Sequence, residues 1–305
     1  MSRARRATEV TRALLRRMPL PRPDAEGDKD SRGRVLAVGG SAETPGAILL
    51  AGVATLRAGA GKLQLASVKS VAAALGVAVP EALVVALPET RGGEISGDAG
   101  ADAIRERVSH IDALLIGPGM TSERAARALV RGVVRRLGDD ATLVLDASAV
   151  TALHDDNDAL LALHGRAVLT PHAGEMATLL GVEKNDVEAN PAEMARDAAE
   201  RFGAVVALKG PESWIAESDG TLYHYAGGSV GLATSGSGDT LAGIVAGLAA
   251  RGAPAVQAAI WGAYLHGAAG EVLARRIGPI GYLARELLDE VPGAMRRLSQ
   301  RTGSQ

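Results

Sequence analysis

Short apolar runs alternate with longer stretches of helical spacing along most of the chain. The first run, "RVLAVGG" at 34–40, is followed by Thr44-Pro45, a pair typical of a capped helix start, and by an apolar stretch to about Gly59. The other runs predict strands at 62–67, 82–87, 113–119, 142–148, 167–171 and 205–210, with helical stretches such as 122–137 and 191–202 between them. Because strands that alternate with helices form parallel sheets covered on both faces, the pattern predicts an α/β fold.

The last hundred residues follow a different pattern. Asp219-Gly220 separates two alternating runs and predicts a β-hairpin. Three helices are expected after it, from about Asp239, Pro254 and Gly281. Since neither an internal repeat nor an interdomain linker is visible, we expect one domain over 1–305, with an amphipathic helix and a loop at 1–33 and a disordered tail at 296–305.

Composition and charge exclude several classes of protein. The 33 basic and 35 acidic side chains give a net charge of −2, which offers no reason to expect nucleic acid or an anionic membrane as partner. The absence of cysteine excludes disulfides, thiolate nucleophiles and cysteine-based zinc sites, and it fits a cytoplasmic protein. The basic N-terminus lacks the apolar region of a secretory signal, and the apolar segment from Ala47 is too short to span a membrane.

Polar side chains gather where the predicted strands end. Open parallel sheets bind ligands beyond the carboxyl ends of their strands. At that edge the sequence places Asp146, His172 and Lys209, together with glycine pairs near 39–40 and 117–119. Turns account for many of the glycines, but they do not account for three polar side chains at one edge. We therefore expect a ligand site there.

The string "ATSGSGDTLAGIVAG" at 233–247 has two interpretations. Gly236 and Gly238 allow close approach of a ligand, and the helix that follows offers N–H groups and a positive dipole end to a phosphate. Asp239 in its first turn could be a helix cap or a base that faces the ligand. Taken alone, the string favours the cap.

Two further strings are equally open when each is taken alone. "LTPHAGEM" presents His172 and Glu175, which could form only a surface loop with a helix-capping glutamate. Lys209 in "VVALKG" could meet phosphate or be solvated. The string "GGSVG" at 227–231 matches a nucleophile elbow but follows a polar hairpin, and no P-loop or GxGxxG string occurs.

In order and spacing, the motifs resemble the ADP/ATP-dependent NAD(P)H-hydrate dehydratases of the ribokinase-like superfamily. The resemblance covers nearly the whole chain through "PGAILLAGVATLRAGAGK", "IGPGM", "LVLDASAV", "LTPHAGEMATLLG", "LKGPESWIA" and "GLATSGSGDTLAGIVAGLAARG". It implies a ribokinase-like three-layer αβα sandwich with a mostly parallel central sheet.

The resemblance also implies a lyase that repairs a damaged cofactor. The expected substrate is the S epimer of hydrated NADH or NADPH (NADHX, NADPHX), which carries a hydroxyl at C6 of the nicotinamide ring. ADP or ATP with Mg²⁺ would phosphorylate this hydroxyl, and phosphate would then leave. The family's habit favours ADP, although no residue of the sequence decides between the two nucleotides.

The roles of individual residues follow from the same resemblance. Asp239 matches the catalytic carboxylate, which also contacts substrate, and the turn at 236–238 matches the hole for phosphoryl charge. The substrate positions correspond to Ala47, Gly119 and His172. The nucleotide positions correspond to Lys209, Gly210, Pro211, Glu212, Ser213 and Gly238, and the hole is formed by Gly236, Ser237 and Gly238. Glu175 matches a glutamate that helps to organise Mg²⁺ in related kinases.

The chain departs from the family pattern in two places. It has "HAGE" where "HPGE" is common, and Ser148 and Thr151 replace an acid and an amide, so the segment after Asp146 is left out of the predicted site. About 30 residues precede the first strand, so we expect cooperation with a separate epimerase. Relatives form homotetramers, and the same assembly is expected here.

Two other functions are compatible with parts of the pattern. A ribokinase-like kinase for a thiazole or pyrimidine alcohol would share "GSGD" but would release a stable phosphate ester. A nucleotide-sensing regulator would bind without turnover, although a regulator has no need of a base such as Asp239.

Overall fold

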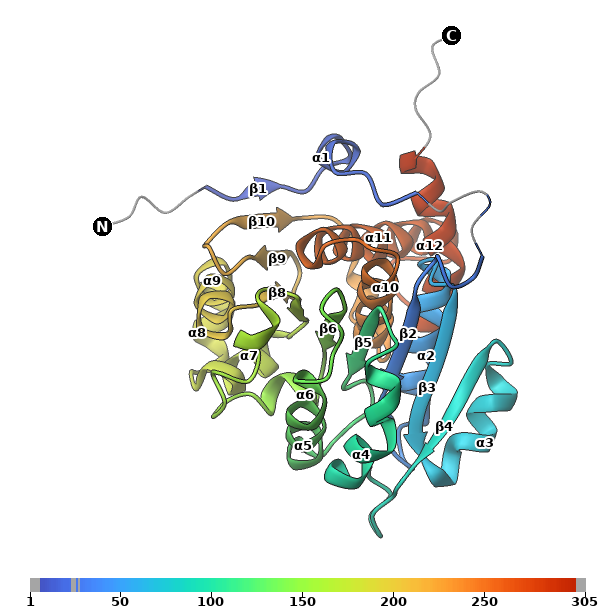
Figure 1. Cartoon of the computed structure of the whole chain (residues 1–305). Helices are drawn as coiled ribbons and strands as arrows, with labels where there is room; N and C mark the ends of the chain where they lie inside the picture. Colours follow the sequence, from blue (N-terminus) through green and yellow to red (C-terminus); the bar gives the residue numbers. More distant parts are fainter. Residues whose placement is uncertain (1–5, 23–25, 27, 300–305) are drawn as a thin grey trace.

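The computed structural model describes residues 6–22, 26 and 28–299, and all strands found there lie in one sheet (Figure 1). The strands are β1 Thr8–Glu9, β2 Arg34–Val38, β3 Lys62–Val68, β4 Ala82–Leu87, β5 Ala113–Ile116, β6 Thr142–Leu145, β7 Ala167–Leu169, β8 Val205–Leu208, β9 Ser213–Ala216 and β10 Leu222–Tyr225. Their spatial order is β1-β10-β9-β8-β7-β6-β5-β2-β3-β4. Neighbours are parallel except β9, which is antiparallel to β8 and β10. The predicted mostly parallel sheet and hairpin are confirmed.

Helices cover both faces of the sheet and form two cores (Figure 1). The helices are α1 Arg12–Arg17, α2 Pro45–Arg57, α3 Lys69–Ala78, α4 Gly97–Val108, α5 Glu123–Val134, α6 Ser148–Thr151, α7 Ala173–Leu180, α8 Lys184–Ala189, α9 Pro191–Phe202, α10 Ser237–Ala250, α11 Ala255–Arg276 and α12 Ala284–Ser299. One core contains α2, α10, α11 and α12, and the other contains α4, α5, α7 and α9. The αβα sandwich is therefore confirmed.

Strand β2 shows why the central strands are continuous apolar runs. Val35 and Ala37 belong to the core with α2 and α10, whereas Leu36 and Val38 belong to the core on the opposite face. All four side chains are fully buried. A strand with helices on both faces needs apolar residues at every position, so its sequence shows no alternation.

The predicted run at 113–119 ends as a strand at Ile116, because the chain turns there. Gly117 has φ of +128°, and a Cβ at this position would lie 1.8 Å from the carbonyl oxygen of Asp146. Glycine is thus required at the end of β5, and the close approach brings Asp146 to the same edge of the sheet.

The N-terminal segment differs from the predicted amphipathic helix. Only Arg12–Arg17 is helical, whereas Thr8–Glu9 forms a strand parallel to β10; residues 1–5 lie outside the described residues. The amide of Val10 donates to the carbonyl of His224 at 2.8 Å, so this segment satisfies the open edge of β10. Such a pairing depends on tertiary structure and leaves no local signal.

The expected tail begins later than predicted. Helix α12 continues to Ser299, because Leu298 is 6% exposed and packs into the core that contains α2 and α10. The remaining residues, 300–305, lie outside the described part of the chain. None of the helices among the described residues has both the length and the apolar character that a membrane span requires.

Candidate active site

A cluster of three charged side chains lies at the carboxyl ends of β6 and β8. Asp146 directly follows β6 and is 3% exposed, and Lys209 directly follows β8. The Lys209 ammonium lies 2.7 Å from Asp146 Oδ1, and Thr170 Oγ1 donates to the same oxygen at 2.8 Å. Glu175 Oε2 is 3.8 Å from the ammonium. We call Asp146, Glu175 and Lys209 the ion cluster; its buried carboxylate is paired, as burial requires.

Helix α7 begins with reciprocal hydrogen bonds between His172 and Glu175. His172 Nδ1 accepts from the amides of Gly174 and Glu175, and Glu175 Oε2 accepts from the amide of His172 at 2.8 Å. The helix-capping interpretation of "LTPHAGEM" is thus confirmed. The same glutamate also belongs to the ion cluster, and burial raises its pKa against the opposing charge of Lys209.

Helix α10 begins at a turn without a side-chain cap. Gly236 precedes the helix with φ of +87°, and this N-cap residue has no side chain that could accept a hydrogen bond from the first turn. The unpaired N–H groups of such a helix start are available to an anion. The Lys209 ammonium lies 3.1 Å from the place that a Cβ on Gly238 would take. The turn and the ion cluster are therefore in contact.

Asp239 lies in the first turn of α10, and the charges of the ion cluster shift its pKa. Burial raises its pKa to about 6; the charges of Asp146 and Glu175 also raise it, and Lys209 lowers it. A carboxylate with a pKa near neutrality is ionised at pH 7 and still able to take a proton, as a general base must. The carboxylate also accepts a hydrogen bond from the backbone amide of Asp239 itself, which lowers its pKa, so the side chain can support the helix start and act as a base at once.

Lys209 keeps its positive charge in this environment. Burial by itself would lower the pKa of its ammonium, but Asp146 and Glu175 outweigh burial, and the pKa is raised above its ordinary value. The site therefore combines a fixed cation, an uncapped helix start and a poised carboxylate. This combination suits the transfer of a phosphoryl group from a nucleotide to a hydroxyl.

Ala47 and Gly119 lie against one another at the start of α2. A Cβ on Gly119, whose φ is +71°, would be 2.9 Å from the Cβ of Ala47 and 2.6 Å from the carbonyl oxygen of Thr44. Thr44 precedes the helix as predicted, but its side chain does not cap it; the hydroxyl donates to the carbonyl of Gly119 at 2.8 Å. The expected cap instead ties two loops of the site together.

The segment after Lys209 turns away from the ion cluster. Gly210, Pro211 and Glu212 connect β8 to β9, which begins at Ser213. Glu212 Oε2 lies 2.7 Å from His224 Nε2 on β10. Of the predicted nucleotide segment, Lys209 therefore faces the turn of α10, while Glu212 faces the hairpin.

A family model for NAD(P)H-hydrate dehydratases matches residues 35–293. The chain belongs to this family. It is 52% identical over 296 residues to the ADP-dependent (S)-NAD(P)H-hydrate dehydratase of Xanthomonas campestris pv. campestris. The aligned residues cover 96% of this chain and 98% of the relative.

Solved structures support the same assignment. A ribokinase-like superfamily protein of Enterococcus faecalis superposes with a TM-score of 0.82 at 26% identity, over 97% of both chains. The ADP/ATP-dependent NAD(P)H-hydrate dehydratase of Bacillus subtilis, co-crystallised with ATP/Mg²⁺, superposes with a TM-score of 0.79 at 28% identity, over 96% of this chain and 99% of that one. The ribokinase-like fold that the resemblance implied is confirmed.

Two side chains of the cluster at the sheet edge are missing from the site residues predicted from the sequence. Asp146 was visible as a strand-end carboxylate, but the substitutions after it led to its omission. Ser148, which was left out with it, donates to the carbonyl of Met120 at 2.6 Å. His266, which contacts Ser237 from α11, has no motif that distinguishes it from a core histidine.

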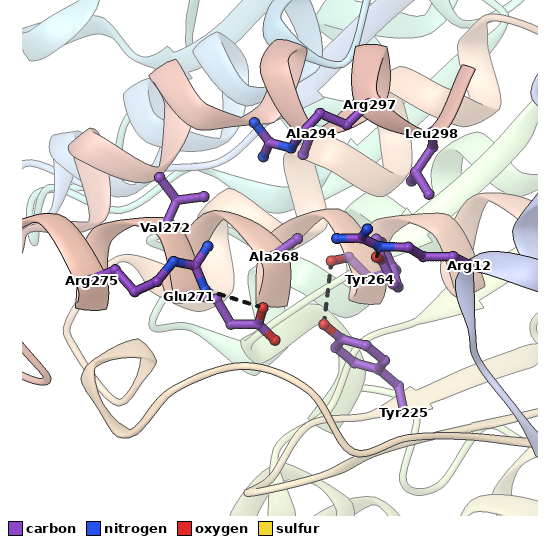
Figure 2. A pocket seen from close by; sticks show the side chains of 10 residues that line it. All are labelled: Arg12, Tyr225, Tyr264, Ala268, Glu271, Val272, Arg275, Ala294, Arg297 and Leu298. Carbon is purple, nitrogen blue, oxygen red and sulfur yellow. Dashed lines mark hydrogen bonds and ion pairs between the residues drawn. The ribbon is translucent and has the colours of Figure 1, made fainter. Parts of the chain in front are cut away.

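A second feature, the cavity in Figure 2, is not the site of this dehydratase. It has a volume of about 110 Å³ and lies between α1, β10, α11 and α12. Its lining residues are Arg12, Tyr225, Tyr264, Ala268, Glu271, Val272, Arg275, Ala294, Arg297 and Leu298. None of the predicted site residues is among them.

Proposed function

We propose that the protein is an ADP- or ATP-dependent (S)-NAD(P)H-hydrate dehydratase that returns NADHX and NADPHX to NADH and NADPH. The observation that carries the proposal is the position of Asp239. This carboxylate, with a pKa raised to about 6, lies at the uncapped start of α10 and beside the ion cluster. It can take the proton of a hydroxyl group at the same place where a phosphoryl group would be bound.

The reaction proceeds in two stages. In the first, the C6 hydroxyl of the hydrated ring gives its proton to Asp239, and the hydroxyl oxygen attacks the terminal phosphorus of the nucleotide. The rest of the nucleotide leaves, as AMP when the donor is ADP and as ADP when the donor is ATP. In the second, the lone pair of the ring nitrogen forms a bond to C6, and phosphate leaves with the electron pair of the C6–O bond. Loss of a proton from C5 then restores the double bond between C5 and C6. Phosphorylation is needed because hydroxide is a poor leaving group.

The surrounding residues receive roles that fit their positions. The turn of Gly236, Ser237 and Gly238 would stabilise the charge that develops on the transferred phosphoryl group. Lys209 would contact the nucleotide phosphates, since its ammonium lies over Gly238. The segment from Gly210 to Ser213 would contact the rest of the nucleotide.

The hydrated dinucleotide would lie on the other side of Asp239. Ala47, Gly119 and His172 are proposed to line its site, as the family resemblance implies. The contact between Ala47 and Gly119 supports this proposal, because it forms a backbone wall at the carboxyl edge of the sheet. His172 is 58% exposed at its side chain, so it is accessible to a ligand.

We propose that Mg²⁺ enters with the nucleotide phosphates, as it commonly does in phosphoryl transfer. The carboxylates of Asp146 and Glu175 already face a cation, because the Lys209 ammonium lies 2.7 Å from Asp146 and 3.8 Å from Glu175. Within the described residues, no group of three or more histidine and carboxylate side chains could hold a metal ion. An indirect role of Glu175 towards Mg²⁺ stays a prediction.

The biological setting is proposed from the family. The Xanthomonas relative is named for the S epimer, so a separate epimerase would be needed to convert the other epimer. We also propose a homotetramer in the cytoplasm, with one domain per chain. The single sheet supports the one-domain proposal, and exposed apolar side chains such as Val77 and Leu83 near the edge strand β4 support assembly.

The proposal is tested by mixing the protein with hydrated NADH, Mg²⁺ and either ADP or ATP, and by following the return of the absorbance of NADH. Recovery that requires a nucleotide is expected. Two parallel reactions, with a thiazole alcohol and a pyrimidine alcohol as acceptors, test for a small-molecule kinase. If NADH is recovered neither with ADP nor with ATP, the dehydratase proposal is contradicted. A stable phosphate ester in the parallel reactions supports a small-molecule kinase instead.

A further inference from the structure

Ser237, in the middle of the phosphoryl-binding turn, is contacted by a histidine from another helix. Ser237 Oγ lies 2.8 Å from Nε2 of His266 on α11, and the Ser237 side chain is buried. The ring of His266 also forms a hydrogen bond with the backbone of Ser237. The proposed reaction gives His266 no part, so a polar contact at this place requires an explanation.

The imidazole of His266 stays neutral at the pH at which the reaction would run. Burial and the positive charge of Lys209 together lower its pKa to about 4. A neutral imidazole carries one N–H and one lone pair, so it can donate to one group of Ser237 and accept from another. It adds no charge beside Asp239, and it does not compete with Lys209 for the ion cluster.

Hydrogen bonds hold the two ends of the turn: the amide of Ser237 donates to the carbonyl of Thr234, and Thr240 Oγ1 donates to the carbonyl of Gly236. Ser237 lies between Gly236 and Gly238, and glycine has more backbone freedom than any other residue. No side chain caps α10. Of these three residues only Ser237 has a side chain, so another helix can hold a side chain of the turn only at this position.

Helix α11 is a firm support for such a contact. Its backbone packs closely on α10, since a Cβ at Gly262 would lie 2.6 Å from Val245 Cγ2. Nearer its N-terminal end, Trp261 Nε1 donates to the carbonyl of Met18. A side chain on this helix is therefore held at a defined place relative to α10.

We propose that His266 is a positioning residue, whose imidazole fixes Ser237 and so orients the N–H groups of the turn towards the transferred phosphoryl group. The inference rests on the proposed dehydratase function. His266 touches no reacting atom and acts only through Ser237. Its contribution should therefore appear in the rate of the chemical step and disappear when Ser237 loses its hydroxyl.

The test compares His266→Ala, His266→Gln, Ser237→Ala and the double variant His266→Ala/Ser237→Ala. Because small misplacements of a binding group cost up to about 100-fold in rate, His266→Ala should lower kcat roughly 10- to 100-fold, with KM and ADP affinity within about twofold of wild type. The glutamine amide can occupy the place of Nε2, so His266→Gln should restore most of kcat. The double variant should be no slower than His266→Ala, because the two residues act as one unit.

Gln257→Ala is the matched control, since it removes another hydrogen-bonding side chain from α11 at a distance from the turn. It should lower the midpoint of urea unfolding but leave kcat unchanged. Three results would each overturn the proposal: kcat of His266→Ala within twofold of wild type, losses that multiply in the double variant, or a loss confined to ADP affinity.

Hydrogen exchange separates this inference from the dehydratase proposal, because it needs no turnover. Amides of the segment 234–242 should exchange about tenfold faster in His266→Ala than in wild type, and His266→Gln should reverse most of the change. Unchanged exchange contradicts the positioning role even if the enzyme is active. A wild-type protein without turnover contradicts the dehydratase function, whatever the exchange shows.

Discussion

The chemistry of the site is determined at the scale of single residues by the opposing effects of Lys209 and Asp146 on Asp239. Asp146 raises the pKa of Asp239, and Lys209 lowers it, while burial raises it most. Neither neighbour touches the hydrated dinucleotide in the proposed reaction. Both nevertheless decide over which pH range the base is ionised, which makes their effects measurable.

The first prediction concerns the pH dependence of the wild-type enzyme. Asp239 must be ionised to take the proton of the hydroxyl, and its pKa is raised to about 6. We therefore expect kcat/KM to be constant at higher pH and to fall tenfold per pH unit below about 6. Initial rates of NADH recovery between pH 5 and pH 8 measure this. A flat profile contradicts the role of Asp239 as base.

The second prediction is that two substitutions move this acid limb in opposite directions. Asp146→Asn removes a charge that raises the pKa of Asp239, so the limb should move to lower pH; Lys209→Met removes a charge that lowers it, so the limb should move to higher pH. Asp112→Asn is the control. Asp112 pairs with Arg34, the first residue of β2, so this substitution should leave the acid limb in place. Shifts in the same direction contradict this electrostatic account.

At the scale of elements, the position of Asp239 depends on the close packing of α10 on α2. A Cβ at Gly243 would lie 2.1 Å from the carbonyl oxygen of Ala51. The two helices also carry neighbouring parts of the site, since α2 begins near Ala47 and α10 begins at the phosphoryl-binding turn. Small residues at the contact allow both helix starts to reach the same edge of the sheet.

The third prediction follows from this packing. Gly243→Ala should lower the free energy of unfolding by about 1–3 kcal/mol, because the new methyl group would push α2 and α10 apart. Gly76→Ala in α3 is the matched control, since its Cβ would lie 3.7 Å from the nearest atom. It should raise stability by about 0.5–1 kcal/mol, the difference in helix propensity. Urea unfolding measures both, and equal stability of the two variants would contradict the packing described.

The fourth prediction concerns the side-chain contacts that connect β1, β10 and the turn after β8. His224 on β10 contacts Glu9 and Glu212, and its ring stacks on Trp214 with centroids 4.2 Å apart. Burial lowers the pKa of His224, but the two carboxylates outweigh burial, so the folded-state pKa lies above its ordinary value of about 6.5.

This stabilisation is fully present below the unfolded-state pKa and is lost as pH rises through the higher folded-state pKa. The stability difference between wild type and His224→Gln should therefore be larger at pH 6 than at pH 9. The change should stay below about 1 kcal/mol, because both carboxylates are largely exposed. Urea unfolding at the two pH values measures it, and a difference that grows with pH would contradict the sign.

Elements were predictable from the sequence where local signals and burial agree. Strand β4 and helix α9 have the predicted bounds, 82–87 and 191–202, because an apolar run or a proline start marks them. The strand at Thr8–Glu9 was not predictable, since it exists only through its pairing with β10. In the site, Asp239 and Lys209 have family motifs, whereas the contact of His266 with Ser237 depends on how α11 packs.

At the scale of the whole molecule, the two cores share one sheet and leave the carboxyl edge open for ligands. The central strands β2, β5, β6, β7 and β8 are covered on both faces, so the polar groups of the site gather beyond the strand ends. The loops there come from both helical layers: α7 carries Glu175, and α10 carries Asp239. The fold thus brings side chains from opposite helical layers together at one edge of the sheet.

The fifth prediction is that this chain assembles as a homotetramer. Sedimentation velocity at micromolar protein concentration should give a mass four times the 31.1 kDa of the chain. Apolar side chains such as Leu83 and Ile280, which are 51% and 69% exposed, would then have surfaces to pack against. A mass of one chain over the whole concentration range contradicts this assembly and leaves the site unaffected, because all its residues come from one chain.

The central claim is that Asp239 is the base of the phosphorylation step, and the most direct measurement is the recovery of NADH from its hydrate by Asp239→Asn beside wild type. A general base contributes about 100- to 10,000-fold to a rate, so turnover with Mg²⁺ and ADP or ATP should fall by that factor. Nucleotide affinity, measured by calorimetry, should stay close to that of wild type. Turnover of Asp239→Asn within a few fold of wild type would contradict the claim.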